Sequence, residues 1–270
     1  MDYRLWESII QDIETIEPKY SLLGSIFSLG YAERVRREAL TQAAHLAGGE
    51  VGIAVDVGAG PGDSTRLIAS LGAGYVVAVE PSSVLVQKPC SGHGALCDAV
   101  QAVAEYLPIR DKAASLASSF YAVRDYGDTQ RGLSELARVA DVIAVGDIFV
   151  PRNALKRLLV KTWVCVIVPP LAALLYLAKG VRYRGICRSL QGWCSLEELA
   201  AALAAREGFN VKTRSFMLGG LGYVVAWKNT GGPNRSQRHT LRGEACRGSE
   251  RGREPGGPNS YKGGREGGAA

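Results

Sequence analysis

A glycine-rich loop that directly follows an apolar run contains the residues best suited to hold a ligand. The run, 53–57, has the composition of a buried parallel strand. The glycines of the loop are Gly58, Gly60 and Gly62. Glycine allows a sharp turn and lets a ligand approach the backbone closely. Apolar residues return at helical spacing after Asp63, and the free N–H groups at the start of that helix favour an anionic group.

Two acids accompany this loop. Asp56 precedes the first glycine by two residues, and Glu80 ends the next apolar run, 75–79. A carboxylate at a strand end can accept hydrogen bonds from both hydroxyls of a ribose. A dinucleotide-binding loop has the pattern G-x-G-x-x-G, whose third glycine would fall on Asp63. The sequence D-V-G-A-G-P-G instead resembles motif I of the class I S-adenosylmethionine methyltransferases.

This resemblance implies a fold and a cofactor. The fold is α/β and Rossmann-like, a mixed seven-stranded sheet with helices on both faces and an antiparallel last strand. The cofactor is S-adenosylmethionine, which leaves as S-adenosylhomocysteine. A segment similar to D-A-E-x-L-P-F has Val103 in place of the Asp, so the adenine contact falls on Asp98 or on the Val103/Ala104 segment. The expected cofactor-binding residues are Asp56, Gly58, Ala59, Gly60, Pro61, Gly62, Glu80, Pro81, Ala104 and Glu105.

The residues expected to act on the acceptor lie at the end of the fourth expected strand, 113–123. In the fold that the resemblance implies, this strand end faces the transferable methyl group. Tyr121, Arg124 and Asp125 stand there. For methylation of a hydroquinone ring, Arg124 can stabilise a phenolate, Asp125 can accept a proton and Tyr121 can hydrogen-bond a ring oxygen. The alternative for Arg124 and Asp125 is a surface ion pair.

Residues 20–228 resemble more narrowly the ubiquinone/menaquinone biosynthesis C-methyltransferases. The N-terminal segment Y-D-x-x-N-x-x-x-S-x-G-x-x-x-x-W-R of that family is matched by Tyr20, Ser28, Gly30 and Arg36. In its Y-x-Y-L-x-x-S-I-x-x-F-P segment, Tyr183, Ser189, Leu190 and Trp193 stand in that order, with Cys194 in place of the Pro. Its L-R-N element is occupied by Val123, Arg124 and Asp125, with Asp125 in place of the Asn. The resemblance implies C-methylation of a lipophilic demethyl-quinol ring, with Tyr20, Arg124 and Tyr183 as substrate-binding residues.

Other activities stay open. The main alternative is a different small acceptor on the same fold. An RNA methyltransferase would suit the basic C-terminal tail, but no N-P-P-Y or D-P-P-Y element follows the fourth expected strand. A binding protein without catalysis is the third alternative. The expected partner is therefore a lipophilic small molecule rather than a nucleic acid, with a peripheral membrane contact and a homodimer as further options.

The composition divides the chain into three parts. Residues 1–46 are expected to form an N-terminal helical cap, and residues 47–228 the methyltransferase domain. Residues 229–270 are expected to be a disordered Gly/Arg-rich tail, because they cannot bury enough apolar surface to fold. Eight basic and four acidic residues give this tail a charge of +4, which is most of the chain's +6.

Residues 151–192 are expected to form a helical insertion near the substrate. Their apolar run, 163–178, is interrupted by Pro169 and Pro170 and flanked by Lys161 and Lys179. It is shorter than the roughly 20 residues that span a bilayer, and the prolines should break it. The pattern predicts either two buried helices or a lipophilic wall over a hydrophobic substrate, in contact with the membrane surface.

The cysteines and the N-terminal residues bear on location. Six cysteines are scattered without a C-x-x-C pair, which argues against a zinc site and against a disulfide framework. The start MDYRLWESII does not resemble a signal peptide. We therefore expect a cytoplasmic protein with buried thiols, peripheral to the membrane if the apolar run touches it.

Overall fold

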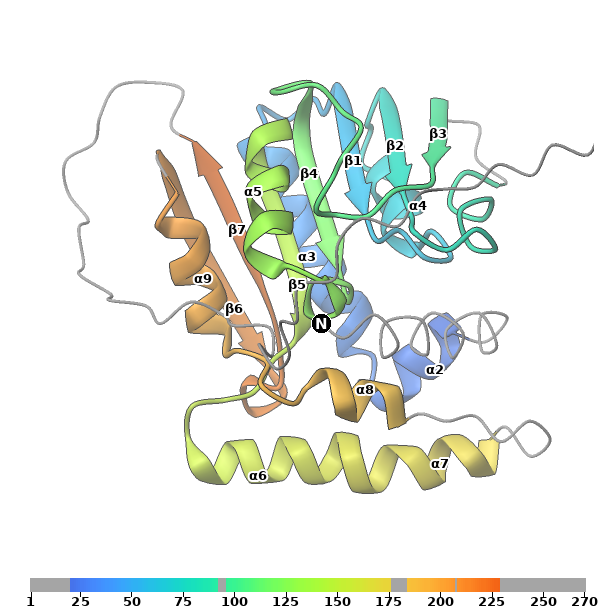
Figure 1. Cartoon of the computed structure of the whole chain (residues 1–270), viewed down its shortest axis with the longest axis vertical. Helices are drawn as coiled ribbons and strands as arrows, with labels where there is room; N and C mark the ends of the chain where they lie inside the picture. The colour runs from blue at the N-terminus through green and yellow to red at the C-terminus, as the bar shows by residue number, and fades with distance from the viewer. Residues whose placement is uncertain (1–19, 92–95, 176–183, 207, 229–270) are drawn as a thin grey trace, which may run out of the picture.

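The computed structural model describes residues 20–91, 96–175, 184–206 and 208–228, which form one seven-stranded sheet with helices on both faces (Figure 1). The strands are β1 (Ile53–Val57), β2 (Tyr75–Val79), β3 (Leu96–Val100), β4 (Ala114–Phe120), β5 (Ala140–Ile148), β6 (Phe209–Phe216) and β7 (Leu221–Lys228). The helices are α2 (Tyr20–Phe27), α3 (Tyr31–Leu46), α4 (Asp63–Ser70), α5 (Thr129–Val139), α6 (Ala154–Thr162), α7 (Val168–Leu175), α8 (Arg184–Ser189) and α9 (Leu196–Ala204). Short helical turns are η2 (Val123–Asp125), η3 (Trp163–Ile167) and η4 (Met217–Gly219).

The strand order is β3-β2-β1-β4-β5-β7-β6. The first five strands are parallel, and β7 runs antiparallel to both β5 and β6. The predicted mixed sheet with an antiparallel end is therefore confirmed. The chain reverses its direction of winding between β1 and β4, and ligands of open α/β sheets bind in the crevice at such a point.

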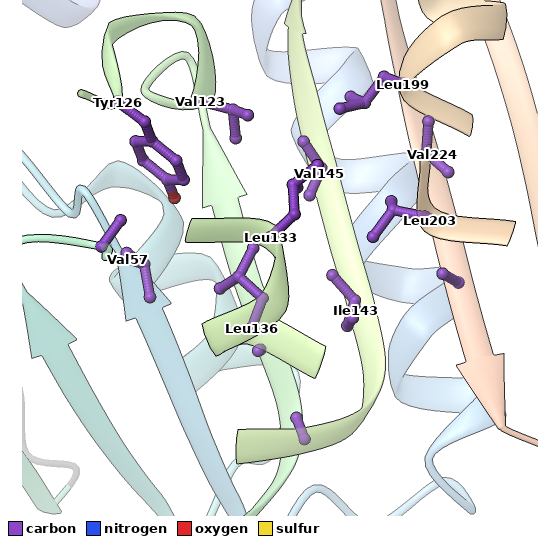
Figure 2. Close-up of a cluster of buried hydrophobic side chains, with 14 of the residues drawn as sticks. Val57, Val123, Tyr126, Leu133, Leu136, Ile143, Val145, Leu199, Leu203 and Val224 are labelled. Atoms are coloured by element: carbon purple, nitrogen blue, oxygen red, sulfur yellow. The ribbon is translucent and has the colours of Figure 1, made fainter. Parts of the chain in front are cut away.

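Alternating side chains of the strands feed a hydrophobic cluster on each face of the sheet. Val55 and Val57 of β1 join the cluster that α5 and α9 cover, whereas Ala54 joins the one that α3 and α4 cover. Figure 2 shows Leu133 and Leu136 of α5 packed over β5 in the first cluster. These layers leave the carboxyl ends of the parallel strands to the loops and to the helices drawn below them in Figure 1.

The segments α6, η3 and α7 form one continuous helix, so the predicted break at the two prolines is wrong. Residues Ala154–Leu174 run without interruption, and only 17% of their most apolar window is buried. Pro169 and Pro170 lie in the first turn of α7, directly after the π-helical turn η3. The wider turn and the first-turn position tolerate the missing N–H groups of proline. The alternative of two buried helices is likewise wrong.

Disulfides also contradict the sequence prediction. Cys90 is bonded to Cys97, and Cys165 of η3 is bonded to Cys187 of α8. Cys194 is disulfide-bonded as well. Spacing along the chain does not reveal which cysteines meet in space, and here helix packing and a loop bring them together. The cysteines therefore do not support the expected cytoplasmic location. That location stays a prediction from the sequence.

Candidate active site

The glycine loop turns the chain at the carboxyl end of β1 and is tied to β2. The amides of Gly58 and Ala59 donate to the carbonyl of Val79 at 2.8 and 3.1 Å. Gly58 has a φ of +71°, and a Cβ placed on it would lie 2.4 Å from the Cβ of Ala122. Only glycine fits this position, because the segment after β4 packs directly against it.

The carboxylate of Glu80 is fixed beside this loop. Glu80 is buried at the end of β2, where its Oε2 accepts from the amide of Gly60 at 2.7 Å and its Oε1 accepts from the amide of Ser82 at 3.0 Å. These two bonds set the orientation of the carboxylate. A carboxylate oxygen can accept more than one hydrogen bond, so this carboxylate is of a type that can also accept from a ribose hydroxyl.

A narrow pocket lies over the loop, and most of the expected cofactor residues line it. They are Gly58, Ala59, Gly60, Pro61, Glu80, Pro81, Ala104 and Glu105. Val103 lines it too, whereas Asp98 is in the middle of β3, away from the pocket, and accepts a hydrogen bond from the Tyr75 hydroxyl. Of the two candidate segments for the adenine contact, only Val103/Ala104 thus borders the pocket.

Two expected cofactor residues lie behind the loop rather than in the pocket. Asp56 is buried, and its two oxygens accept from the hydroxyls of Thr65 and Ser118, both at 2.7 Å. It therefore joins β1 to α4 and β4. A Cβ on Gly62 would lie 2.6 Å from the Cα of Pro89, so only glycine lets the loop after β2 pack closely at this position. Both residues shape the pocket without lining it.

A second, larger cavity of about 740 Å³ opens beside the first. It lies between α2, α3, the α6–α7 helix and η4, and most of its lining is aliphatic or aromatic. The charged residues that line it are Glu33, Arg36, Asp63 and Arg124. The volume falls within the range of small-molecule sites.

The two pockets meet at Arg36, Asp63 and Tyr121, which line both of them. Arg36 is buried, donates from Nε to the hydroxyl of Ser64 at 3.0 Å and lies 5.4 Å from the centre of the Tyr121 ring. The Tyr121 hydroxyl donates to the carbonyl of Ala32 at 3.0 Å. The polar end of the large cavity is therefore the end that adjoins the narrow pocket.

Arg124 and Asp125 belong to a buried network, not to a surface ion pair. The Arg124 guanidinium is bonded to the buried Asp147, donates from Nε to the Ser189 hydroxyl at 3.1 Å and lies 3.2 Å from Asp125 Oδ2. Arg124 lines the large cavity, and Asp125 lines the narrow pocket. The pair thus spans the wall between them.

Asp125 is the carboxyl group of this wall whose pKa is raised. Burial raises its pKa to about 6, although the adjacent Arg124 cation opposes the rise. Its Oδ1 is buried and has no hydrogen-bond partner among the described residues. A carboxylate with an open oxygen and a pKa of this order is suited to accept a proton near neutral pH.

Strained backbone gathers around the large cavity. Leu29, Tyr121, Met217 and Leu218 have positive φ angles of 51°, 61°, 48° and 58°, and all four line it. A left-handed conformation is costly for bulky residues and persists where the surrounding structure imposes it. Such strain is concentrated at functional sites, which supports the assignment of the cavity as one.

The remaining expected residues divide in two groups. Tyr183 and the side chain of Tyr20 lie outside the described part of the structure. Sequence reasoning missed Asp63 and Asp147 as site residues. It noted Arg36 only through its match to an N-terminal family segment and did not assign it to the site. Asp147 ends β5, and the ends of parallel strands meet at one edge of the sheet.

The sequence matches known proteins over this site. A family model described as a methyltransferase domain matches residues 55–141. The ubiquinone/menaquinone biosynthesis C-methyltransferase of Geotalea uraniireducens (strain Rf4) is 27% identical over 228 residues, covering 81% of this chain and 94% of that protein.

Solved structures match the fold. A SAM-dependent methyltransferase from Thermotoga maritima has a TM-score of 0.52 at 18% identity and covers 83% of this chain and all of that one. The plantazolicin methyltransferase BpumL, solved with S-adenosylhomocysteine and a desmethyl analogue, has a TM-score of 0.53 at 11% identity, over 85% of this chain and all of that one. At this identity the likeness concerns the fold alone.

Proposed function

We propose that this chain, which is a class I S-adenosylmethionine-dependent methyltransferase, methylates a ring carbon of a lipophilic demethyl-quinol. The observation that carries the proposal is the large cavity, which is apolar along most of its wall and polar where it adjoins the narrow pocket. A quinol with an isoprenoid tail has the same division, because its ring carries hydroxyls and its tail is hydrocarbon. The 27% identity to a quinone C-methyltransferase supports the same acceptor class.

The residues that line the narrow pocket suit S-adenosylmethionine, the cofactor of this class. A Cβ on Gly60 would project into open space, so this glycine leaves the pocket free beside the Glu80 carboxylate. Glu80 would accept from the ribose hydroxyls, and the Val103/Ala104 segment would border the adenine. The orphaned Oδ1 of Asp125 offers an acceptor to a cationic or hydroxyl group. When bound, the cofactor supplies a methyl group activated on a sulfonium.

The residues of the wall between the pockets would bind and deprotonate the ring. A ring carbon becomes nucleophilic when a ring hydroxyl loses its proton, and Asp125 would accept that proton directly or through a water. The ring carbon that takes the methyl group would then lose its own hydrogen as a proton to water, which restores the aromatic ring. The Tyr121 hydroxyl donates to the carbonyl of Ala32, and because a hydroxyl oxygen can both donate and accept, it would accept from a second ring hydroxyl. Arg124 would hold Asp125 in place and keep positive charge beside the phenolate.

Methyl transfer from labelled S-adenosylmethionine tests the proposal. A demethyl prenyl quinol in detergent under reducing conditions is the expected acceptor, with total RNA offered in parallel. We expect the label in the lipid extract and none in RNA. Label in RNA, or in neither acceptor while the cofactor still binds, would overturn the quinol assignment.

A cavity-filling variant makes the test specific to this cavity. Val164 lines the large cavity and not the narrow pocket, so Val164→Trp should raise the KM for the quinol about tenfold or more. Its affinity for the cofactor should stay at the wild-type value. Leu96→Trp, an exposed replacement at the start of β3 that lines neither pocket, is the control and should change neither quantity.

A further inference from the structure

We propose that the outer face of the continuous helix 154–174 docks the protein flat onto a bilayer that contains anionic lipid, with the mouth of the large cavity against the lipid. Three independent features carry this inference: an exposed apolar stripe, a charge pattern without acids, and an apolar rim around the cavity. Vesicle binding requires neither cofactor nor acceptor, and only the reason for facing the cavity toward lipid rests on the proposed function.

The apolar stripe is long and exposed. Leu155, Leu158, Val166 and Leu174 are each 62–66% exposed. Leu155, Leu158, Leu159, Val166 and Ala173 follow one another at spacings that place them on one side of a helix. Large apolar side chains gathered on one exposed helix face mark an interaction surface rather than ordinary protein surface.

The charges around the stripe select an anionic partner. No acidic residue occurs from position 149 to position 196, whereas eight residues there are basic. Lys156, Arg157 and Lys161 of α6 are exposed, and so is Arg152 just before the helix, which pairs with Glu198 at 3.2 Å. Basic residues beside an apolar helix face are attracted to the negative surface of a membrane with anionic lipid. A second copy of this chain would bring the same positive charge against itself, which disfavours a dimer through this face.

The inner face of the helix excludes a membrane-spanning arrangement. Val160, Val168 and Ala172 are buried against the domain, and Trp163 Nε1 donates to the carbonyl of Phe27 at 2.9 Å. The Cys165–Cys187 disulfide adds a covalent link to α8. A helix that spans a bilayer is surrounded by lipid or by other spanning helices. This helix has one side fastened to the domain and therefore lies along the surface, as it does along the lower edge of Figure 1.

The cavity opens on the same side. Leu29, Leu159, Ile167 and Leu218 line the cavity and yet are 43–65% exposed, so they form its rim. Leu159 and Ile167 belong to the helix itself, which makes the rim continuous with the apolar stripe. An acceptor with a hydrocarbon tail can then enter from the lipid without exposing that tail to water.

Flotation of the full chain with vesicles tests the proposal, without cofactor or quinol. Vesicles of phosphatidylcholine with about one-third phosphatidylglycerol should carry the protein, and pure phosphatidylcholine should carry much less. Alkaline carbonate should release the protein from the vesicles, as it does other surface-bound proteins. Failure to float with anionic vesicles, or resistance to the carbonate wash, would overturn the flat docking.

Two pairs of variants assign the binding to the helix. Leu155→Ser with Leu158→Ser should weaken vesicle binding at least about tenfold, because it removes two exposed apolar side chains that would enter the lipid. Neither residue lines a pocket, so the binding of cofactor and acceptor should be unaffected. Val84→Ser with Leu96→Ser removes comparably exposed apolar side chains from the region around β3 and should bind as wild type. Equal binding by the two variants would contradict the assignment to the helix.

Charge reversal gives the second pair. Lys156→Glu with Arg157→Glu should lower binding at least about tenfold and weaken its salt dependence. Lys112→Glu with Lys212→Glu changes the net charge by the same amount at exposed positions on other elements. An equal loss in both would show that net charge alone drives binding and would overturn the helix as the docking surface. Thermal melting and cofactor binding report whether each variant is folded.

Discussion

At the scale of single residues, the glycines of the loop have different roles. A Cβ placed on Gly58 or Gly62 would lie only 2.4 or 2.6 Å from protein atoms, whereas a Cβ on Gly60 would meet only open space in the pocket. Gly60→Ala should therefore fold, at a cost of roughly 1 kcal/mol for its positive φ, yet bind S-adenosylmethionine at least about tenfold more weakly. Gly72→Ala, also at positive φ in open space but outside the pocket, is the matched control for calorimetry. Equal affinities for the two variants would remove Gly60 from the cofactor site.

Asp125 sets the expected pH dependence. Its pKa is raised to about 6, so it carries a proton at lower pH and cannot accept one. The kcat should rise with pH through about 6 and then level off, and Asp125→Asn should lower it by about 10²-fold or more and lose this limb. Asp111→Asn, at an exposed position, is the control. An unchanged pH profile in Asp125→Asn would assign the proton transfer to another group.

The same group makes the free energy of unfolding decrease as the pH rises. The folded state binds this proton more tightly than the unfolded state, whose carboxyl titrates near 3.8, so the contribution of Asp125 is lost between about pH 4 and pH 6. The shift of about two pKa units corresponds to up to about 3 kcal/mol. Urea unfolding should therefore show Asp125→Asn gaining on the wild type as pH rises from 4 to 7. A constant difference would mean that the pKa is not raised.

Truncation of Arg124 to alanine should destabilise the protein as well as affect its activity. Its side chain lies between the buried Asp147 and the largely buried Asp125. Arg124→Ala leaves both carboxylates without their cation and should cost about 3–5 kcal/mol of unfolding free energy. Arg124→Lys keeps the charge and should cost less, while it loses the geometry that orients Asp125. Urea unfolding of the two variants should separate them, and equal stabilities would contradict the buried network.

At the scale of elements, the disulfide between Cys165 and Cys187 joins two walls of the large cavity, whereas the disulfide between Cys90 and Cys97 lies outside it. The bridge of η3 to α8 closes 22 residues and the bridge of Cys90 to Cys97 closes seven. Loop-closure entropy predicts losses of about 3 and about 2 kcal/mol when each pair is changed to serine. Cys165→Ser with Cys187→Ser should also raise the KM for the quinol, because η3 lines the large cavity. The variant Cys90→Ser with Cys97→Ser is the comparison. A larger loss of unfolding free energy in this variant than in the Cys165/Cys187 variant would contradict the prediction.

At the scale of the whole molecule, the shape of the large cavity predicts how the KM depends on the length of the acceptor's isoprenoid tail. Its wall is apolar from the polar junction to the exposed rim. Each isoprene unit that is buried adds hydrocarbon contact, so the KM should fall at least about tenfold from a tailless quinol to one with a first unit. The fall should level off once the tail passes the rim. A KM independent of tail length, measured in one detergent, would argue against this cavity as the acceptor site.

Features encoded by neighbouring residues could be predicted from the sequence. The strand–loop–helix 53–70, the strand that ends at Glu80 and the capping box of Ser195 with Glu198 all form as expected. Each depends on hydrophobic period, glycine conformation or a bond across three residues. The order and spacing of these motifs also indicated the methyltransferase class, because its cofactor contacts come from successive strand ends.

Only the tertiary structure decided which distant residues meet. It placed Arg36 of α3 at the junction of the pockets and Asp147 against Arg124, and it placed the Val103/Ala104 segment, rather than Asp98, at the narrow pocket. It also paired the cysteines and carried one helix through two prolines. These outcomes depend on packing between elements far apart in the chain, where local propensity carries no information about the partner.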